Sequence, residues 1–268
     1  MIKKLCILTI VGISTLTTQA APEWQRKVGA FKNGSHEKLP ATRLVYNLSW
    51  KGVLKSGTMS FDFNKTDKRY PGALISQASG RSTGAAYAIY PYTFTMTSFM
   101  KGKDNKPILF VANEKDGKEK VYTKNKYTAK GTTHYSLTDI TKTGKKEERN
   151  HLFKYGNVHD PLSAILYIRK QPLKNGDKVN LCLHPFASPM YAEITVLGRE
   201  NHRGRACIKM DVKLHKIDTF KLGLKDYKKL KKATLWISDD KDRVMVELRS
   251  KVFIGDVRAV LQSQTPIK

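Results

Sequence analysis

Apolar and polar residues alternate with a period of two along most of this chain. The pattern is clearest where Leu44, Tyr46, Leu48 and Trp50 fall on one side of a single segment. Side chains of a β-strand point alternately to the two faces of a sheet, so this period is typical of strands with one buried face. The alternation predicts a mainly β protein, built as a curved antiparallel sheet or an open β-barrel.

Turn residues separate many such segments, so we expect a long succession of strands. The further segments are residues 57–63, 73–78, 92–99, 107–113, 120–123, 132–137, 149–155, 179–184, 190–198, 205–214, 234–237, 244–250 and 252–261. Asp116 and Gly117 stand between two of them and are a preferred pair for a hairpin turn. No linker or internal repeat divides the chain. We therefore expect a single β-rich domain over residues 41–263, preceded by a loosely ordered segment at 21–40.

One segment has helical spacing instead and predicts a helix at about residues 160–169. Asp160 is a good N-cap, and Pro161 suits the first helical position because its missing N–H costs nothing there. An apolar stripe follows, made of Leu162, Ile165 and Leu166. We expect this stripe to pack on the sheet and Lys170, beyond it, to be exposed. Shorter helices or loops are expected at 82–90 and 224–232.

The first residues have the order of a secretory signal peptide. Lys3 and Lys4 precede an apolar run at 5–16, and small residues follow at 18–21. The run is shorter than the roughly 20 residues that a membrane-spanning helix needs. We expect residues 1–20 to be cleaved, with an uncleaved anchor as the alternative, and no transmembrane span in the mature chain. The protein is then periplasmic or otherwise exported, and soluble or peripheral to the membrane.

The chain is strongly basic, with a formal net charge of +26. Such an excess attracts anionic partners such as phospholipid headgroups or acidic glycans, with solubility alone as the alternative explanation. Most of the basic residues are lysines, which provide diffuse attraction rather than specific readout, and export argues against nucleic acid. The densest cluster of lysines in the mature chain is predicted to contact anionic membranes. It consists of Lys228, Lys229, Lys231 and Lys232.

The mature chain keeps two cysteines, Cys182 and Cys207. An oxidising compartment would permit a disulfide between them. In a simple meander one strand would separate them by roughly 10 Å, whereas bridged Cα atoms lie about 4.4 to 6.8 Å apart. Two buried free thiols are therefore the favoured interpretation, and the bridge is the alternative.

Motifs for catalysis, metal binding and cofactor binding are not found. The acidic cluster at 238–242 suits a hairpin turn better than a calcium site or an acid–base pair, since Asp is common in tight turns. The histidines lack the spacing of a zinc site, and the chain has neither a serine nucleophile elbow nor a Walker loop. We therefore predict no catalytic residue, no metal and no cofactor.

An aromatic run at 87–94 follows Arg81 and is the strongest candidate for a ligand site. Aromatic rings beside a cation can line a pocket for a sugar or an acyl chain, with core filling as the alternative. The candidate ligand-binding residues are Arg81, Tyr87, Tyr90, Tyr92 and Arg169.

Several segments, taken in order, resemble the bacterial exported family called Domain of Unknown Function 3108. They are residues 46–52 with Gly57, the helix at 160–169, residues 173–177, residues 235–240 with Arg243 and Val244, and residues 254–255 with 259–261. The chain departs from the family in its lysine content and in Met245, where the family usually has proline. The resemblance covers about residues 38–261. It implies a bacterial envelope protein built on antiparallel β-structure, similar to the half-barrels in which lipoprotein carriers hold acyl chains, and it supplies no catalytic residues.

Three functions follow from these observations. The leading hypothesis is a non-enzymatic envelope protein that binds lipid or lipid-linked glycan in a β-half-barrel. The first alternative is an envelope scaffold or assembly factor that binds protein or anionic cell wall, and the second is an uncharacterised hydrolase. A lipid carrier needs a cavity of some hundreds of Å³, whereas a scaffold does not.

Overall fold

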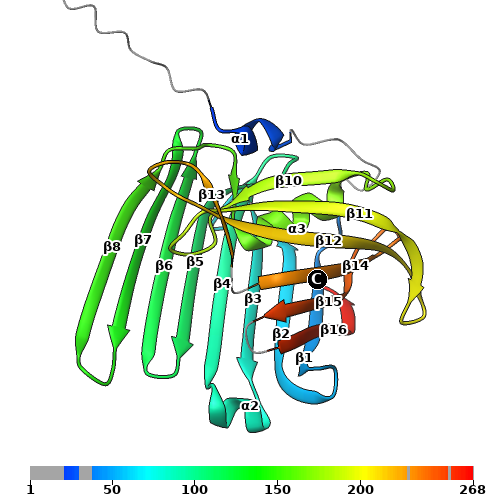
Figure 1. The fold of residues 1–268 in the computed structure, drawn as a ribbon, viewed down its shortest axis with the longest axis horizontal. Helices are drawn as coiled ribbons and strands as arrows, with labels where there is room; N and C mark the ends of the chain where they lie inside the picture. The colour runs from blue at the N-terminus through cyan, green and yellow to red at the C-terminus, as the bar shows by residue number, and fades with distance from the viewer. Residues whose placement is uncertain (1–20, 30–37, 228–229, 253–254, 268) are drawn as a thin grey trace, which may run out of the picture.

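The computed structural model describes residues 21–29, 38–227, 230–252 and 255–267. The expected signal peptide therefore lies outside the described residues. The prediction of a mainly β fold is confirmed (Figure 1). The strands are β1 (Thr42–Trp50), β2 (Leu54–Lys65), β3 (Leu74–Ser82), β4 (Tyr92–Lys101), β5 (Lys106–Asp116), β6 (Glu119–Thr128), β7 (Gly131–Ile140), β8 (Lys145–Phe153), β9 (Val158–His159), β10 (Lys178–Leu183), β11 (Met190–His202), β12 (Arg205–Ile217), β13 (Leu224–Asp226), β14 (Leu230–Ser238), β15 (Met245–Val252) and β16 (Gly255–Pro266). The described helices are α1 (Glu23–Lys27), α2 (Gly84–Ile89) and α3 (Pro161–Lys170).

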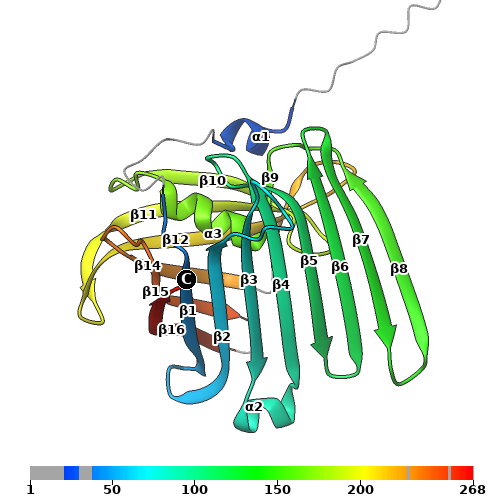
Figure 2. The ribbon, with the colours of Figure 1, turned by 180° about the vertical axis from the view of Figure 1, so that it is seen from behind.

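All the described strands belong to one open sheet. Its order runs from β8 back through β7 to β1, then through β16, β15, β14, β12, β11 and β10 to β9, while β13 pairs with β12. The first and last strands therefore meet at the centre, where Thr42 lies opposite Pro266 and Trp50 opposite Val257. The sheet bends so that β10–β12 cross the upper ends of the early strands, with α3 beneath them (Figures 1 and 2).

The predicted helix is confirmed as α3, and its start follows the predicted chemistry. The Asp160 carboxylate accepts hydrogen bonds from the N–H groups of Leu162 and Ser163, at 2.8 and 3.1 Å, and Pro161 stands in the first turn. These bonds satisfy helix N–H groups that would otherwise be left unpaired inside the protein.

Helix α3 packs between two parts of the core. Leu162 and Leu166 are fully buried against β1–β3, while Ala164, Tyr167 and Ile168 pack against β10–β12 and β14. A helix clamped on two sides fixes the curvature of the sheet around it. The remaining member of the predicted stripe, Ile165, is only half-buried.

The expectation that Lys170 is exposed is wrong. Its side chain is buried, and its ammonium group donates to the Lys103 carbonyl at 3.0 Å and to the Asn105 side-chain oxygen. The turn between β4 and β5 covers this end of α3, which sequence spacing along the helix alone does not reveal.

Two further segments differ in detail from the sequence pattern. Residues 23–27 form α1, and Trp24 is buried and donates from its ring to the Leu222 carbonyl at 2.7 Å, while the order of the whole segment 21–40 stays a prediction. The described part of 224–232 forms strand rather than helix, as β13 and the start of β14.

The two cysteines are free thiols, and both are buried. Cys182 on β10 lies opposite Tyr191, and Cys207 on β12 lies opposite Glu200, so β11 separates them and they stand far apart along it. The alternative of a Cys182–Cys207 bridge is not what the structure contains.

Candidate functional site

The inner face of the sheet, on the side of α3, carries a set of apolar side chains that the core does not fully cover. We call this set the inner apolar surface. It consists of Leu48, Met59, Phe94, Met96, Ile165, Met245, Leu248 and Leu261. Each is half-buried and packs against fully buried core residues. A ligand on this side of the sheet would therefore meet apolar groups from β1, β2, β4, α3, β15 and β16.

Aromatic rings extend this surface along β4. Tyr90, Tyr92 and Phe94 follow at every second position, so they share the inner face, and Met96 continues the row. The ring centroids of Tyr90 and Tyr92 are 6.0 Å apart, and those of Tyr92 and Phe94 are 5.9 Å apart. The row leads from exposed Tyr90, near α2, toward the buried core.

The tyrosine hydroxyl groups in this row are held by carboxylates of β5. Tyr90 donates to Asp116 at 2.6 Å, and Tyr92 donates to Glu114. Burial, together with these acceptors, raises the pKa of Tyr90 to about 12 and raises that of Tyr92 further. Burial also raises the pKa of Glu114. Both phenols stay neutral near pH 7, so this end of the inner face presents two tyrosine rings whose hydroxyl groups are held by neighbouring carboxylates.

The structure brings together only two of the five predicted ligand-binding residues, Tyr90 and Tyr92. Arg81 lies opposite Thr93 and Thr58, which puts it on the outer face of the sheet. Tyr87 is half-exposed on α2. The ligand role of these residues stays a prediction.

Arg169, the fifth, has a structural environment. It is fully buried, donates to the carbonyls of Arg243 and Asp242 at 2.9 and 2.7 Å, and stacks over the Phe63 ring at 5.1 Å. Burial lowers the pKa of its guanidinium to about 10. These contacts tie α3 to the turn between β14 and β15.

The predicted membrane-contacting lysines are only partly within the described chain. Lys228 and Lys229 lie outside the described residues, while Lys231 and Lys232 lie on β14. Their contact with a membrane stays a prediction.

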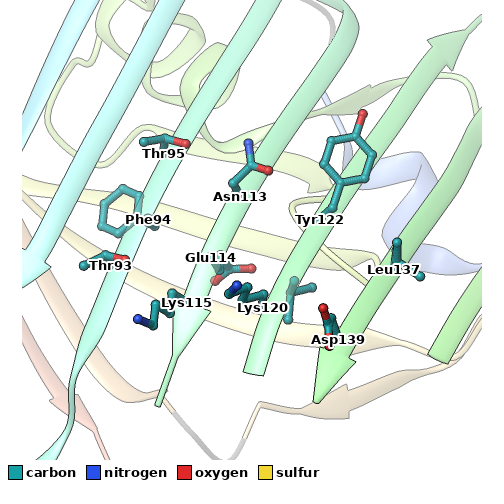
Figure 3. Close-up of a pocket in the computed structure, with 11 residues that line it drawn as sticks. Thr93, Phe94, Thr95, Asn113, Glu114, Lys115, Lys120, Tyr122, Leu137 and Asp139 are labelled. Carbon is teal, nitrogen blue, oxygen red and sulfur yellow. The ribbon is translucent and has the colours of Figure 1, made fainter. Parts of the chain in front are cut away.

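A hollow of about 380 Å³ lies on the outer face of β4–β7 (Figure 3). Its lining combines polar residues such as Thr93 and Asn113 with apolar ones such as Phe94 and Leu137. None of the predicted ligand-binding residues lines it. It is shallow and open, and most of its lining faces away from the inner apolar surface, with Phe94 common to both.

A buried histidine cluster is a feature that the sequence analysis missed. His134 and His151 lie directly opposite each other on β7 and β8, and His184 follows β10. Their ring centroids are 4.6 to 5.5 Å apart. Among the described residues, no group of His, Cys, Asp or Glu has an arrangement that could hold a metal ion. The only sequence signal was the shared alternation of His134 and His151 on adjacent strands.

Burial keeps these imidazoles neutral. It lowers the pKa of His134 to about 4 and that of His184 to about 3, and it also lowers the pKa of His151. The Asn125 side chain holds His134 at 2.7 Å, whereas neither ring nitrogen of His184 has a hydrogen-bond partner among the residues that the structure describes. The cluster therefore disfavours protonation.

The acidic cluster at 238–242 is the hairpin turn that we predicted. The Asp240 carboxylate accepts from the Ser238 hydroxyl and from the N–H groups of Asp242 and Arg243, at 2.8 to 3.0 Å. Its oxygens are used within the turn between β14 and β15.

Comparisons with known proteins place the chain by family and fold. The family described as "Protein of unknown function (DUF3108)" matches residues 45–262. No curated protein matches the chain in sequence. A β-barrel-like protein of Domain of Unknown Function DUF1849 from Brucella abortus is similar in structure, with a TM-score of 0.55 and 12% identity over 86% of this chain and 99% of that one.

A second solved structure, the Mycobacterium tuberculosis lipoprotein LppX, matches 85% of this chain and 89% of its own. Its TM-score is 0.24 at 10% identity, which is too low to establish a shared fold. None of the described helices of the present chain is long and apolar enough to cross a membrane.

Proposed function

The chain belongs to the DUF3108 family, and from this premise we propose that it is a non-enzymatic envelope protein that holds an acyl chain on its inner apolar surface. The proposal rests on one observation: eight apolar side chains of the inner face remain half-exposed beside a well-packed core. Apolar groups exposed together on one face commonly mark a binding site. A lipid or a lipid-linked glycan supplies the matching chemistry.

The energetics favour an extended apolar ligand. Each buried methylene contributes about 0.8 kcal/mol, so a chain of many methylenes gains most from a long apolar surface. The row from Tyr90 to Met96 has this elongated form and begins at exposed Tyr90. The lysine-rich surface favours an anionic headgroup at the exposed end.

The signal-like N-terminus supports an exported, periplasmic location for this activity. In that compartment an acyl chain needs shielding from water as it passes between membranes. We propose that the mature chain is soluble or peripheral to the membrane while it provides that shielding.

Native mass spectrometry of the full chain, purified without detergent from a bacterial envelope, tests the proposal. A retained lipid appears as a discrete added mass. Binding is then measured with a fluorescent fatty acid at a concentration at which it is monomeric. Saturable 1:1 binding supports the proposal, and its absence favours the alternative of a scaffold with a packed interior.

Neighbouring residues of β4 offer a matched pair of variants. Phe94→Gln places an amide on the inner face, and Thr95→Gln places the same group on the outer face. We expect about tenfold weaker fatty-acid binding for Phe94→Gln, since a buried ring is worth about 1.5–3 kcal/mol, and no change for Thr95→Gln. Equal affinities for both variants would place the ligand elsewhere.

A further inference from the structure

Exposed large apolar side chains gather at one end of the molecule. Six of the twelve such side chains among the described residues fall in two short segments, 50–54 and 87–90. We call these six the apolar tip. They are Trp50, Val53, Leu54, Tyr87, Ile89 and Tyr90, with exposed fractions of 40, 90, 47, 51, 83 and 54%. The first three lie in the hairpin of β1 and β2, at the end of β1, in the turn and at the start of β2, and the others belong to α2 and the residue after it.

Backbone contacts hold the two segments side by side. The Thr83 N–H, at the start of α2, donates to the Ser56 carbonyl of β2 at 3.1 Å. The Ser82 hydroxyl donates to the Tyr90 carbonyl at 2.9 Å and so ties down the far end of α2. The turn and α2 lie together at the lower end of the sheet in both views (Figures 1 and 2).

The turn between β1 and β2 is held firmly. Lys51 and Gly52 adopt positive φ angles of 52° and 76°, and the Lys51 N–H donates to the Asp256 carbonyl of β16 at 2.7 Å. Val53 is thereby presented to solvent at the end of an ordered hairpin. An ordered aliphatic side chain in water gains nothing within the monomer, since its burial would be favourable.

Helix α2 leads to the same conclusion. It reads GAAYAI, and none of its residues is buried. A six-residue helix is far below the length at which helices are stable alone, and apolar packing normally supplies the missing stability. Here its apolar side chains face outward, so they are available to an external partner.

Charge decides which partner fits. Lys51 and Lys55 flank the apolar tip and are exposed, as is Arg81 on the neighbouring strand. Asp256, beside the turn, pairs with Arg258 at 3.3 Å, whereas Asp116 accepts a hydrogen bond from the Tyr90 hydroxyl on the other side of the tip. A partner that meets the β1–β2 turn should therefore be apolar at its centre and negatively charged beside Lys51 and Lys55.

Composition and size favour a lipid surface over a protein. Trp and Tyr rings prefer the interface between hydrocarbon and water, and lysines beside them reach anionic headgroups. A stable protein interface usually involves about 20–30 residues on each side, many more than the apolar tip offers.

We propose that the apolar tip inserts into the interfacial region of an anionic phospholipid bilayer, with Lys51 and Lys55 contacting the headgroups. This inference stands apart from acyl-chain binding, because five of the six residues lie outside the proposed acyl-chain site and only Tyr90, at the exposed end of the aromatic row, is shared. It also gives the protein a fixed orientation, with α2 and the β1–β2 turn toward the membrane.

Vesicle co-sedimentation of the full mature chain tests the proposal. The probes are vesicles of phosphatidylcholine alone and of phosphatidylcholine with phosphatidylglycerol. We expect binding to the anionic vesicles to fall at least about tenfold when Val53→Ser and Ile89→Ser are combined, since both side chains lose the apolar burial. Phe220→Ser is the matched control, because Phe220 is 95% exposed on a different loop, and it should change binding less than about twofold.

Two further measurements separate the contribution of the lysine charges from that of membrane insertion. Combining Lys51→Gln with Lys55→Gln should weaken anionic binding by about fivefold per lysine at low salt and leave neutral binding unchanged. Trp50 reports insertion, because Trp24 and Trp236 are only 3 and 4% exposed. Its emission should shift to the blue on anionic vesicles and be quenched by lipid labelled near the headgroup.

Equal sedimentation of the Val53→Ser, Ile89→Ser variant and the unmodified chain would overturn the proposal. Equal binding to neutral and anionic vesicles would overturn the role given to the lysines, and an unchanged Trp50 spectrum would exclude insertion. The same double variant should keep its affinity for monomeric fatty acid. An unmodified chain that binds anionic vesicles but no fatty acid would refute the acyl-chain proposal and leave the present one standing.

Discussion

Buried histidines, among them His134 and His184, make the stability of this protein sensitive to acid. The pKa values of His134 and His184 lie near 4 and 3 in the folded protein, whereas a histidine in an unfolded chain has a pKa near 6.5. At a pH between the folded and the unfolded pKa values, the unfolded chain binds protons at these histidines and the folded protein does not. The free energy of unfolding is therefore fully available above about pH 6.5 and falls as the pH drops toward 4.

We expect the free energy of unfolding to fall by up to about 1.4 kcal/mol per pH unit for each of His134 and His184 as the pH drops below 6.5. Urea unfolding at pH 7 and at pH 5 measures it. His184→Leu should flatten the dependence, because it removes a titrating ring whose nitrogens have no partner. Phe153→Leu, beside the same ring, should lower stability equally at both pH values. An unchanged slope for His184→Leu would contradict this account.

Asp160 is the residue on which the start of α3 depends. Its carboxylate serves two helix N–H groups and accepts from the buried Ser98 hydroxyl at 2.6 Å. Asp160→Ala should cost about 2–4 kcal/mol, because the cap is lost and the Ser98 hydroxyl is left unpaired. Asp160→Asn keeps an acceptor oxygen and should cost less.

The comparison variant for this measurement is Asp177→Ala. Asp177 also accepts from a backbone N–H, that of Lys174 at 2.8 Å, but in an exposed turn. Its removal should cost about 1 kcal/mol or less in the same denaturant titration. Similar losses for Asp177→Ala and Asp160→Ala would mean that burial of the cap contributes nothing.

At the scale of the element, the predicted apolar stripe of α3 has two fully buried positions and one half-buried position. Leu162→Ala and Leu166→Ala should each cost about 2–5 kcal/mol, since both side chains are fully buried. Ile165→Ala should cost about 1 kcal/mol, because Ile165 is half-buried on the inner apolar surface. Thermal or urea unfolding of the three variants ranks their losses of stability. A loss of stability for Ile165→Ala as large as that for Leu166→Ala would contradict the packing described.

The free edge of the sheet is protected by its composition. Strand β8 ends the sheet on one side, and its sequence KKEERNHLF begins with five charged residues. Charges on an edge strand discourage pairing with a second chain. An open sheet of this size can therefore remain monomeric at that edge.

How far the sequence predicts each element depends on whether its signal is local. The alternation at 44–50 and the cap at Asp160 are local, and both β1 and α3 form as predicted. Arg81 lies opposite Thr93 and so on the other face from Tyr92, as strict alternation over the odd spacing between Arg81 and Tyr92 also gives.

Other features depend on contacts between distant segments, which the alternation does not specify. Lys170 is buried because the turn between β4 and β5 reaches it, and the histidine cluster needs β7, β8 and the end of β10 to meet. The apolar tip is likewise formed by two segments that are more than 30 residues apart. Only the folded sheet shows that they share one end of the molecule.

At the scale of the whole molecule, the last strand holds the two halves of the sheet together. Strand β16 pairs with β1 on one side and with β15 on the other. A chain that stops at residue 254 would leave β1 and β15 each without a partner on one side and would divide the sheet. We expect this truncated chain to show no cooperative thermal transition, whereas removing only residues 267 and 268 should leave the transition intact. A cooperative transition in the shorter chain would show that the early strands form a stable unit by themselves.

The pairing of β1 with β16 also limits the rate of folding. Contacts between residues 42–50 and 257–266 close a loop of more than 200 residues, and proteins with such distant contacts fold slowly. Strand β1 emerges from the ribosome or the export channel long before its partner exists. During that interval one edge of β1 stays unsatisfied, so newly made chains are vulnerable to aggregation until the C-terminal strand arrives.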